Sequence, residues 1–168
     1  MQLRAVDPTK PRRLRKLFVE PLAVSPVGTW YVKKISPPVD LALNRLTGGR
    51  LTSLPLPTVF LTHTGARSGK ERISPLLYFS DGEDVVLMAS NYGGERHPAW
   101  YHNVKANPEV RLRARGREGA YRARIAAGEE RDRLWELAKR YTRAYKRYEE
   151  IADHRTIQVV VCSPLDPA

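Results

Sequence analysis

The stretch Thr58–Phe79, TVFLTHTGARSGKERISPLLYF, contains two apolar runs on either side of a polar connection. The first run covers residues 59–61 and the second covers residues 73–79, and both are rich in side chains that favour β-strands. The connection contains Gly65 and Gly69, which are typical of a loop between strands. We therefore expect a strand, a loop and a second strand.

The polar connection carries groups that bind anions. Its glycines let backbone amides approach a ligand closely. Hydroxyls and cations surround them, namely Thr62, Thr64, Ser68, Arg67, Lys70 and Arg72. Lysine and arginine donate charge-assisted hydrogen bonds to phosphates, so the loop is interpreted as a receptor for an anion such as a phosphate. These residues leave a second interpretation open, a solvated hairpin whose cations protect the edge of a sheet.

Length and composition limit the possible partners. A chain of 168 residues is expected to form a single domain with room for a core. The formal net charge of +11 favours nucleic acid, an anionic membrane surface, or a small molecule with several phosphates or carboxylates. The single cysteine, Cys162, excludes an internal disulfide and fits a reducing, cytoplasmic compartment. The four histidines do not lie at metal-ligand spacing, so no metal site is expected.

Residues 1–25 are expected to form a basic N-terminal arm, followed by a folded domain at residues 26–168. The arm is rich in cations, with Arg4, Lys10, Arg12, Arg13, Arg15 and Lys16 against Asp7 and Glu20. Leu14, Leu17 and Phe18 would share one helical face, which suits a peripheral position on an anionic membrane at its inner face. A disordered tail is the alternative. We expect no transmembrane helix.

A helix is predicted to begin at Ser36-Pro37-Pro38. Serine is a common helix cap, and proline is tolerated in the first turn. Apolar residues follow at helical spacing and are expected to pack on the sheet, namely Val39, Ala42, Leu43 and Leu46. Gly48 and Gly49 should end the helix.

Four more strands are predicted, over residues 85–89, 110–114, 120–127 and 157–162. Most of them form hairpins with short turns between neighbours. About six mostly antiparallel strands with few helices between them favour an α+β domain that closes into a small barrel. One hairpin is expected to present a positive surface, made by Arg111, Arg113, Arg115, Arg117, Arg122 and Arg124.

Two later helices are predicted. One starts near Pro98 and ends near Asn107, and the other has Glu129 and Glu130 in its first turn, where their charges complement the helix dipole. If the second helix continues, spacings of four and three place Tyr141, Tyr145 and Tyr148 on one face. No serine–histidine–acid set or pair of carboxylates suggests catalysis by side chains alone, so an enzyme with this sequence would need a cofactor.

Several short motifs occur in a recognisable order: LTHTGARSG (61–69), Asp81-Gly82, Ala89-Ser90, HPAWY (97–101), KANP (105–108), and Arg155-Thr156-Ile157 leading to Pro164. Together they resemble the deazaflavin-dependent nitroreductase family of actinobacteria, over residues 59–164. The resemblance implies a split β-barrel that uses reduced coenzyme F420 to pass hydride to a quinone or a nitroaromatic compound. F420 carries a phosphate and an oligoglutamate tail, so the resemblance favours the anion-binding interpretation of the glycine-bearing loop.

The resemblance also implies roles for individual residues. The family's phosphate loop corresponds to Gly65, Arg67, Ser68, Gly69 and Arg72, with Thr64 and Lys70 beside it. The deazaflavin ring is expected to meet Ser90, Asn91, Tyr92 and Gly93, with Trp100 as a wall of that pocket. Tyr141, Tyr145 and Tyr148 correspond to the substrate side, and their hydroxyls, with that of Ser90, are the candidate donors where charge develops. Ala66 stands where relatives usually carry a second cation, and Asn91 where the founding nitroreductase has lysine.

Other functions remain as alternatives. A relative of this barrel could use FMN or store a ligand, and tightly held FMN would make the purified protein yellow. A nucleic-acid or membrane-surface binder is the other alternative, and it depends on the arginine-rich hairpin and the basic arm. Specific nucleic-acid binding is not expected. The sequence does not indicate an oligomeric state.

Overall fold

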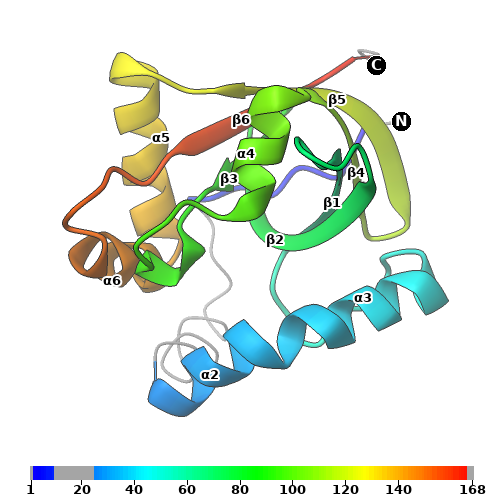
Figure 1. Cartoon of the computed structure of the whole chain (residues 1–168), viewed down its shortest axis with the longest axis horizontal. Coiled ribbons are helices and arrows are strands. Elements are labelled where there is room, and N and C mark those ends of the chain that lie inside the picture. The colour runs from blue at the N-terminus through cyan, green and yellow to red at the C-terminus, as the bar shows by residue number, and fades with distance from the viewer. Residues whose placement is uncertain (1, 10–24, 166–168) are drawn as a thin grey trace.

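The computed structural model describes residues 2–9 and 25–165, and its centre is a closed antiparallel barrel (Figure 1). The strands are β1 (Thr58–Thr64), β2 (Glu71–Asp81), β3 (Asp84–Met88), β4 (Glu109–Ala114), β5 (Arg117–Ile125) and β6 (Val159–Pro164). Around the barrel they follow the order β1-β2-β3-β6-β5-β4, with β4 returning to pair with β1. The predicted α+β split-barrel fold is confirmed.

Five α-helices and one short 3₁₀ turn accompany the barrel in the described residues. The helices are α2 (Pro26–Lys34), α3 (Ser36–Thr47), α4 (Ala99–Ala106), α5 (Gly128–Tyr141) and α6 (Arg143–Ile151), and the 3₁₀ turn is η2 (Asn91–Gly93). Helices α2 and α3 lie across one side of the barrel, while α5 and α6 cover another (Figure 1). The predicted strand–loop–strand is β1 and β2, which pair from Thr58 opposite Leu77 to Thr64 opposite Glu71.

The apolar side chains form two clusters. One fills the barrel interior, where Val59 and Leu61 of β1 are fully buried beside Trp100 of α4. The other joins the outside of β3 and β6 to α5 and α6, and includes Leu134 and Trp135. Because apolar burial is the main favourable term in folding, the second cluster fixes α5 and α6 against the barrel wall.

The helix expected to continue past Tyr141 instead breaks at Thr142. Thr142 is extended, with φ −150° and ψ 138°, and its side chain accepts a hydrogen bond from the amide of Ala144 as the cap of α6. The expectation that Tyr141, Tyr145 and Tyr148 share one helical face is therefore wrong. The break turns the chain, so that α6 packs back towards η2.

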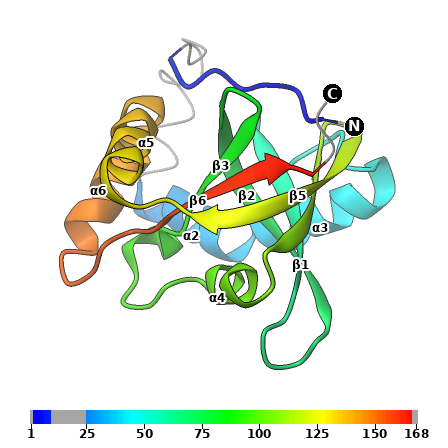
Figure 2. The same cartoon turned by 90° about the horizontal axis from the view of Figure 1, so that it is seen from above.

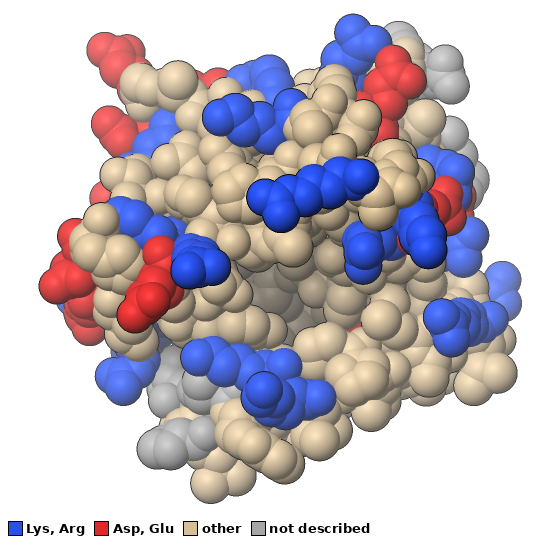
Figure 3. All heavy atoms as spheres, in the orientation of Figure 1, with Lys and Arg blue, Asp and Glu red and all other residues tan. Residues whose placement is uncertain are grey.

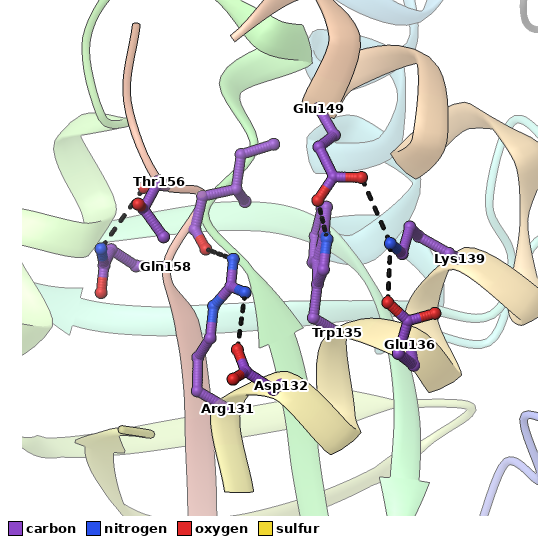
Figure 4. A network of polar contacts seen from close by, with 9 residues as sticks. Arg131, Asp132, Trp135, Glu136, Lys139, Glu149, Thr156 and Gln158 are labelled. Carbon is purple, nitrogen blue, oxygen red and sulfur yellow. Dashed lines mark hydrogen bonds and ion pairs between the residues drawn. The ribbon is translucent and has the colours of Figure 1, made fainter. Parts of the chain in front are cut away.

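Polar contacts hold α6 to α5 (Figure 4). The indole Nε1 of Trp135 donates to Glu149, and Nζ of Lys139 lies 3.3 Å from the same carboxylate and 2.7 Å from Glu136. Arg131 extends this network to the segment before β6, where it donates to the carbonyl oxygen of Ile157 at 3.0 Å. Glu149 is thus the residue through which these polar contacts hold α6 to α5.

Helix α3 exists where it was predicted, but it buries a neighbouring, polar face instead of the predicted apolar one. Its buried residues are Ser36, Asp40 and Asn44, whereas Val39 is 38% exposed and Leu46 is 82% exposed. Asp40 accepts hydrogen bonds from Ser36 Oγ at 2.9 Å and from the amide of Ser53 at 2.6 Å. This polar contact selects the inward face, and Ser36 lies inside the helix rather than at its cap.

The first described residues lie against the barrel. The amide of Leu3 donates to Tyr121 Oη at 3.1 Å, and Val6 exchanges hydrogen bonds with Ser80. Leu3 and Val6 also pack on the apolar clusters. The predicted basic arm therefore begins on the barrel surface, and its residues 10–24 lie outside the described part of the chain. Within the described residues, no helix is both long and apolar enough to cross a membrane.

Candidate active site

A pocket of about 280 Å³ lies between the barrel and helices α2 and α3. Its floor comes from β2 and the end of β3, including Ser74 and Met88, and Trp100 of α4 forms part of its wall. Helix α6 closes it with Tyr145 and Tyr148. This face of the molecule is hollowed between the barrel and α2–α3, and lysine and arginine side chains border the hollow (Figure 3).

The loop after β3 enters the pocket in an unusual backbone conformation. Asn91, Tyr92 and Gly93 have positive φ values of 47°, 55° and 77°. A positive φ is uncommon for a residue other than glycine, and such strain persists only where the surroundings impose it. Here Arg155 imposes it, because its guanidinium donates to the carbonyl oxygens of Ser90 at 2.7 Å and Gly94 at 2.9 Å.

Tyr92 and Tyr148 form an aromatic wall of the pocket. Their ring centroids lie 5.8 Å apart in an edge-to-face arrangement. Tyr92 Oη donates to the carbonyl oxygen of Val32 in α2 at 3.2 Å, so this residue connects α2 to α6. Burial, with the Tyr92 hydroxyl nearby, raises the pKa of Tyr148 to about 12. The hydroxyl of Tyr148 is therefore neutral across the physiological pH range.

The structure brings together most of the residues predicted for the ring and substrate side. Ser90, Asn91, Tyr92, Trp100, Tyr145 and Tyr148 all line the pocket. Tyr141 does not line it, because it packs on Phe79 beneath α5 at a ring-centroid distance of 5.8 Å. Gly93 also lies outside the lining and sits against α6 instead.

The glycine-bearing loop between β1 and β2 projects from the barrel on the side of α4 (Figure 2). Its backbone is held by bonds from the amide of Gly65 to the carbonyl oxygen of Lys70 and from that of Gly69 to Gly65, at 2.9 and 2.8 Å. Gly69 has a positive φ of 65°. A Cβ added at Gly65 would lie 2.6 Å from Ser68 Oγ, so a larger residue there would displace the Ser68 side chain. The side chains of Arg67, Ser68, Lys70 and Arg72 are exposed.

Ion pairing distinguishes this loop from the arginine-rich hairpin. In β4 and β5, Arg111 and Arg113 contact Glu118, Arg122 lies 2.9 Å from Glu109, and Arg124 lies 2.6 Å from Glu130. Within the described residues, no carboxylate pairs with a cation of the loop at residues 65–72. Four of the six hairpin arginines thus have carboxylate partners, whereas the loop cations have none within the described residues.

Some pocket residues were not foreseen from the sequence. Asp40 and Ser36 reach the pocket because α3 turns its polar face inward, and Ser74 reaches it from β2. Arg155 was noted only as part of a motif, and its contacts to the loop at residues 90–97 become visible once the chain is folded. The sequence does not show which side of α3 or β2 faces inward, so it gives no signal for Ser36, Asp40 or Ser74 as pocket residues.

These features fit a deazaflavin coenzyme. A largely aromatic and apolar pocket accepts a flat ring, and a glycine turn with exposed cations accepts a phosphate or an anionic tail. Helix α4 joins the two parts, because Trp100 lines the pocket while Asn103 accepts a hydrogen bond from the loop amide of Ala66 at 2.9 Å. No group of histidine, cysteine or acidic residues in the described chain is placed to hold a metal ion.

Comparison with known proteins agrees with this fit. The chain is 34% identical over 125 residues to an F420H(2)-dependent quinone reductase of Mycobacterium tuberculosis, covering 70% of this chain and 80% of the relative. A solved F420-H2 dependent reductase is 38% identical, with a TM-score of 0.59 over 64% of this chain and 94% of that chain. Another solved chain, described as a domain-swapped dimer, is 35% identical with a TM-score of 0.62, over 73% and 94% respectively. The family profile matches residues 40–164, and the chain belongs to the F420H(2)-dependent quinone reductase family.

Proposed function

We propose that this chain is an F420H2-dependent oxidoreductase that reduces a quinone, or a nitroaromatic compound of similar shape. The observation that carries the proposal is the pairing of an aromatic pocket with a glycine turn whose cations have no carboxylate partner among residues 2–9 and 25–165, the two being joined by α4. Family membership gives the same reaction and the same coenzyme. The coenzyme supplies the hydride, and the chain supplies binding and orientation.

Each part of the site has a role in this proposal. Arg67, with Lys70 and Arg72 beside it, binds the coenzyme phosphate and tail, and Trp100 is a wall against the ring. Hydride transfer requires the acceptor to be stacked on the ring, with donors placed where negative charge develops on its oxygens. Ser90 and Tyr148 line the pocket and carry hydroxyls that can donate there. Because the pKa of Tyr148 is about 12, it donates a hydrogen bond without losing its proton.

Coenzyme choice tests the proposal. With menadione as acceptor, F420H2 should support turnover at least about tenfold better in kcat/KM than NADPH, because its longer anionic tail can reach the cations of the loop. The purified protein should also lack the yellow absorbance of bound FMN. Equal or better turnover with NADPH would contradict the proposal, and tightly bound FMN would favour the flavin alternative.

A membrane surface is the proposed source of the acceptor. Most exposed large apolar side chains of the described residues lie on α2, α3 and the segment after them: Val27, Trp30, Ile35, Val39, Leu46 and Leu51. The same stretch carries Lys33, Lys34, Arg45 and Arg50, and its single acid, Asp40, is buried. Exposed apolar groups surrounded by cations suit anionic lipid. The inner sides of these helices line the pocket, which would place its entrance beside the lipid.

Vesicle binding tests this surface. Leu46→Ser should weaken binding to phosphatidylglycerol-containing vesicles severalfold while leaving turnover with soluble menadione unchanged. Leu165→Ser is the control, because Leu165 is also exposed but lies far from α3 in the sequence and outside this surface. The predicted arm is tested by Arg12→Gln with Arg13→Gln rather than by deletion, since residues 3 and 6 pack on the barrel. If vesicle binding is unaffected both by Leu46→Ser and by the double change at Arg12 and Arg13, neither segment meets the membrane.

A further inference from the structure

A chain of hydrogen bonds runs beneath the glycine-bearing loop from α4 to the pocket. The amide of Ala66 donates to Asn103 Oδ1 at 2.9 Å. Asn103 Nδ2 lies 3.1 Å from His63 Nδ1, and His63 Nε2 lies 3.1 Å from Ser74 Oγ. His63 and Asn103 are 3% and 9% exposed, so these groups depend on one another for their hydrogen bonds.

The direction of every bond in this chain is fixed by its first donor. A backbone amide can only donate, so the Asn103 atom that faces Ala66 must be the carbonyl oxygen. The amide nitrogen of Asn103 then faces His63 and donates to Nδ1, which must lack a proton. A neutral imidazole with an unprotonated Nδ1 carries its proton on Nε2. His63 therefore donates to Ser74 Oγ, and Ser74 is the acceptor.

A neutral His63 agrees with its surroundings. Burial, and to a smaller extent the charge of Arg72, lower its pKa below the usual value of 6.5. The other charged groups near it are Glu71, Glu109 and Arg111, which line a surface cleft with His63; Arg111 lies 2.8 Å from Glu71. A protonated His63 would face the Asn103 amide with a second donor, so the chain of bonds itself disfavours protonation.

Since Ser74 Oγ accepts from His63, its own hydroxyl proton is left to donate. Ser74 lines the pocket, and within the described residues no acceptor for that proton is found. We propose that Ser74 is a directed hydrogen-bond donor to a carbonyl oxygen bound in the pocket, oriented through His63 and Asn103. The coenzyme ring and a quinone both carry carbonyl oxygens. This inference rests on the proposed function.

The same chain links the two parts of the site. Ala66 belongs to the loop proposed to hold the phosphate, and Ser74 belongs to the pocket proposed to hold the ring. His63 and Asn103 are thus positioning residues, because they act through Ser74 and through the loop amide. A merely structural buried histidine would not fix the direction of a hydroxyl in the pocket.

Ser74→Ala tests the donor directly. It should weaken either F420 binding or the apparent affinity for menadione about tenfold, which corresponds to one hydrogen bond. A change in the F420 dissociation constant, measured by fluorescence, assigns the donor to the coenzyme. A change confined to the menadione KM assigns it to the acceptor. Ser74→Thr keeps the hydroxyl and should recover most of the affinity.

Ser80→Ala is the matched control. Ser80 is a half-buried serine of the same strand and accepts a bond from the amide of Val6 at 3.1 Å, but it does not line the pocket. Both alanine variants lose one accepted N–H bond, so both should lose similar thermal stability. If Ser74→Ala binds F420 and menadione as Ser80→Ala does, Ser74 is only a structural acceptor and the proposal fails.

A measurement on the protein without coenzyme keeps the inference separate from the proposed function. In ¹⁵N-histidine-labelled protein at pH 7, long-range ¹H–¹⁵N NMR should show His63 protonated on Nε2 and unprotonated on Nδ1, with the signals assigned by their loss in His63→Phe. Protonation on Nδ1 would overturn the inference. Failure of the wild-type protein to bind F420 would overturn the proposed function, and with it the coenzyme as the ligand of Ser74, but the direction of the hydrogen bonds would stand.

Discussion

Gly93→Ala should lower both the stability of the protein and its turnover with quinone. Gly93 has a positive φ of 77°, and a Cβ there would lie 2.7 Å from Ile151 Cβ and 3.0 Å from the carbonyl oxygen of Tyr148. The backbone strain costs about 1 kcal/mol and the overpacking about 1–3 kcal/mol. Together they should lower the melting temperature by roughly 4–16 °C. Because the clash pushes against α6, Tyr148 should move and kcat/KM for the quinone should fall.

Gly82→Ala separates the two causes. Gly82 also has a positive φ, 61°, but no atom lies within 4 Å of a Cβ added there. This variant should show the backbone cost alone and normal turnover. If Gly93→Ala is no less stable than Gly82→Ala and equally active, α6 can move away from the added Cβ at no cost. In that case α6 does not hold the pocket wall in place.

Local patterns in the sequence predicted the barrel well. The β1–β2 hairpin follows from two apolar runs around a glycine-bearing connection, and all six strands occur where alternating or apolar runs lie beside turn residues. Such signals act between neighbours in the chain. They are sufficient for a barrel built mainly of hairpins.

The inward face of α3 could not be predicted in this way. Helical spacing shows that Val39, Leu43 and Leu46 lie near one another, but not whether that face is buried. The choice depends on Asp40, whose carboxylate accepts a bond from Ser53, 13 residues further along the chain. A buried polar group must find such a partner, so this contact outweighs the exposure of apolar side chains.

The two main features of the pocket also depend on distant contacts. The left-handed backbone of Tyr92 contradicts the ordinary preference of a tyrosine, and it is supported by Arg155, which lies 65 residues beyond Ser90. The break after Tyr141 does have a local signal in the sequence, since Thr142 is a good helix cap. With the break, Tyr145 and Tyr148 reach the pocket while Tyr141 remains in the core.

Arg67→Ala should weaken coenzyme binding about ten- to a hundredfold, the largest effect expected from a single surface change. Arg67 is exposed on the loop, no carboxylate of the described residues pairs with it, and the neighbouring position is Ala66. We therefore expect Arg67 to be the main cationic contact to the phosphate. Losing a charge-assisted bond to phosphate costs roughly 1.5–3 kcal/mol. The melting temperature should hardly change, because truncating an exposed side chain leaves no cavity.

The kinetic pattern distinguishes a phosphate contact from a catalytic one. A phosphate held away from the reacting ring is bound alike in the ground and transition states, so the KM for F420H2 should rise with little change in kcat. Arg122→Ala is the matched control, since it removes the same charge from an exposed arginine that already pairs with Glu109. Lys70→Ala should have a smaller effect than Arg67→Ala. If Arg67→Ala and Arg122→Ala raise the KM equally, the loop contributes only to the general positive field and the proposed phosphate contact is wrong.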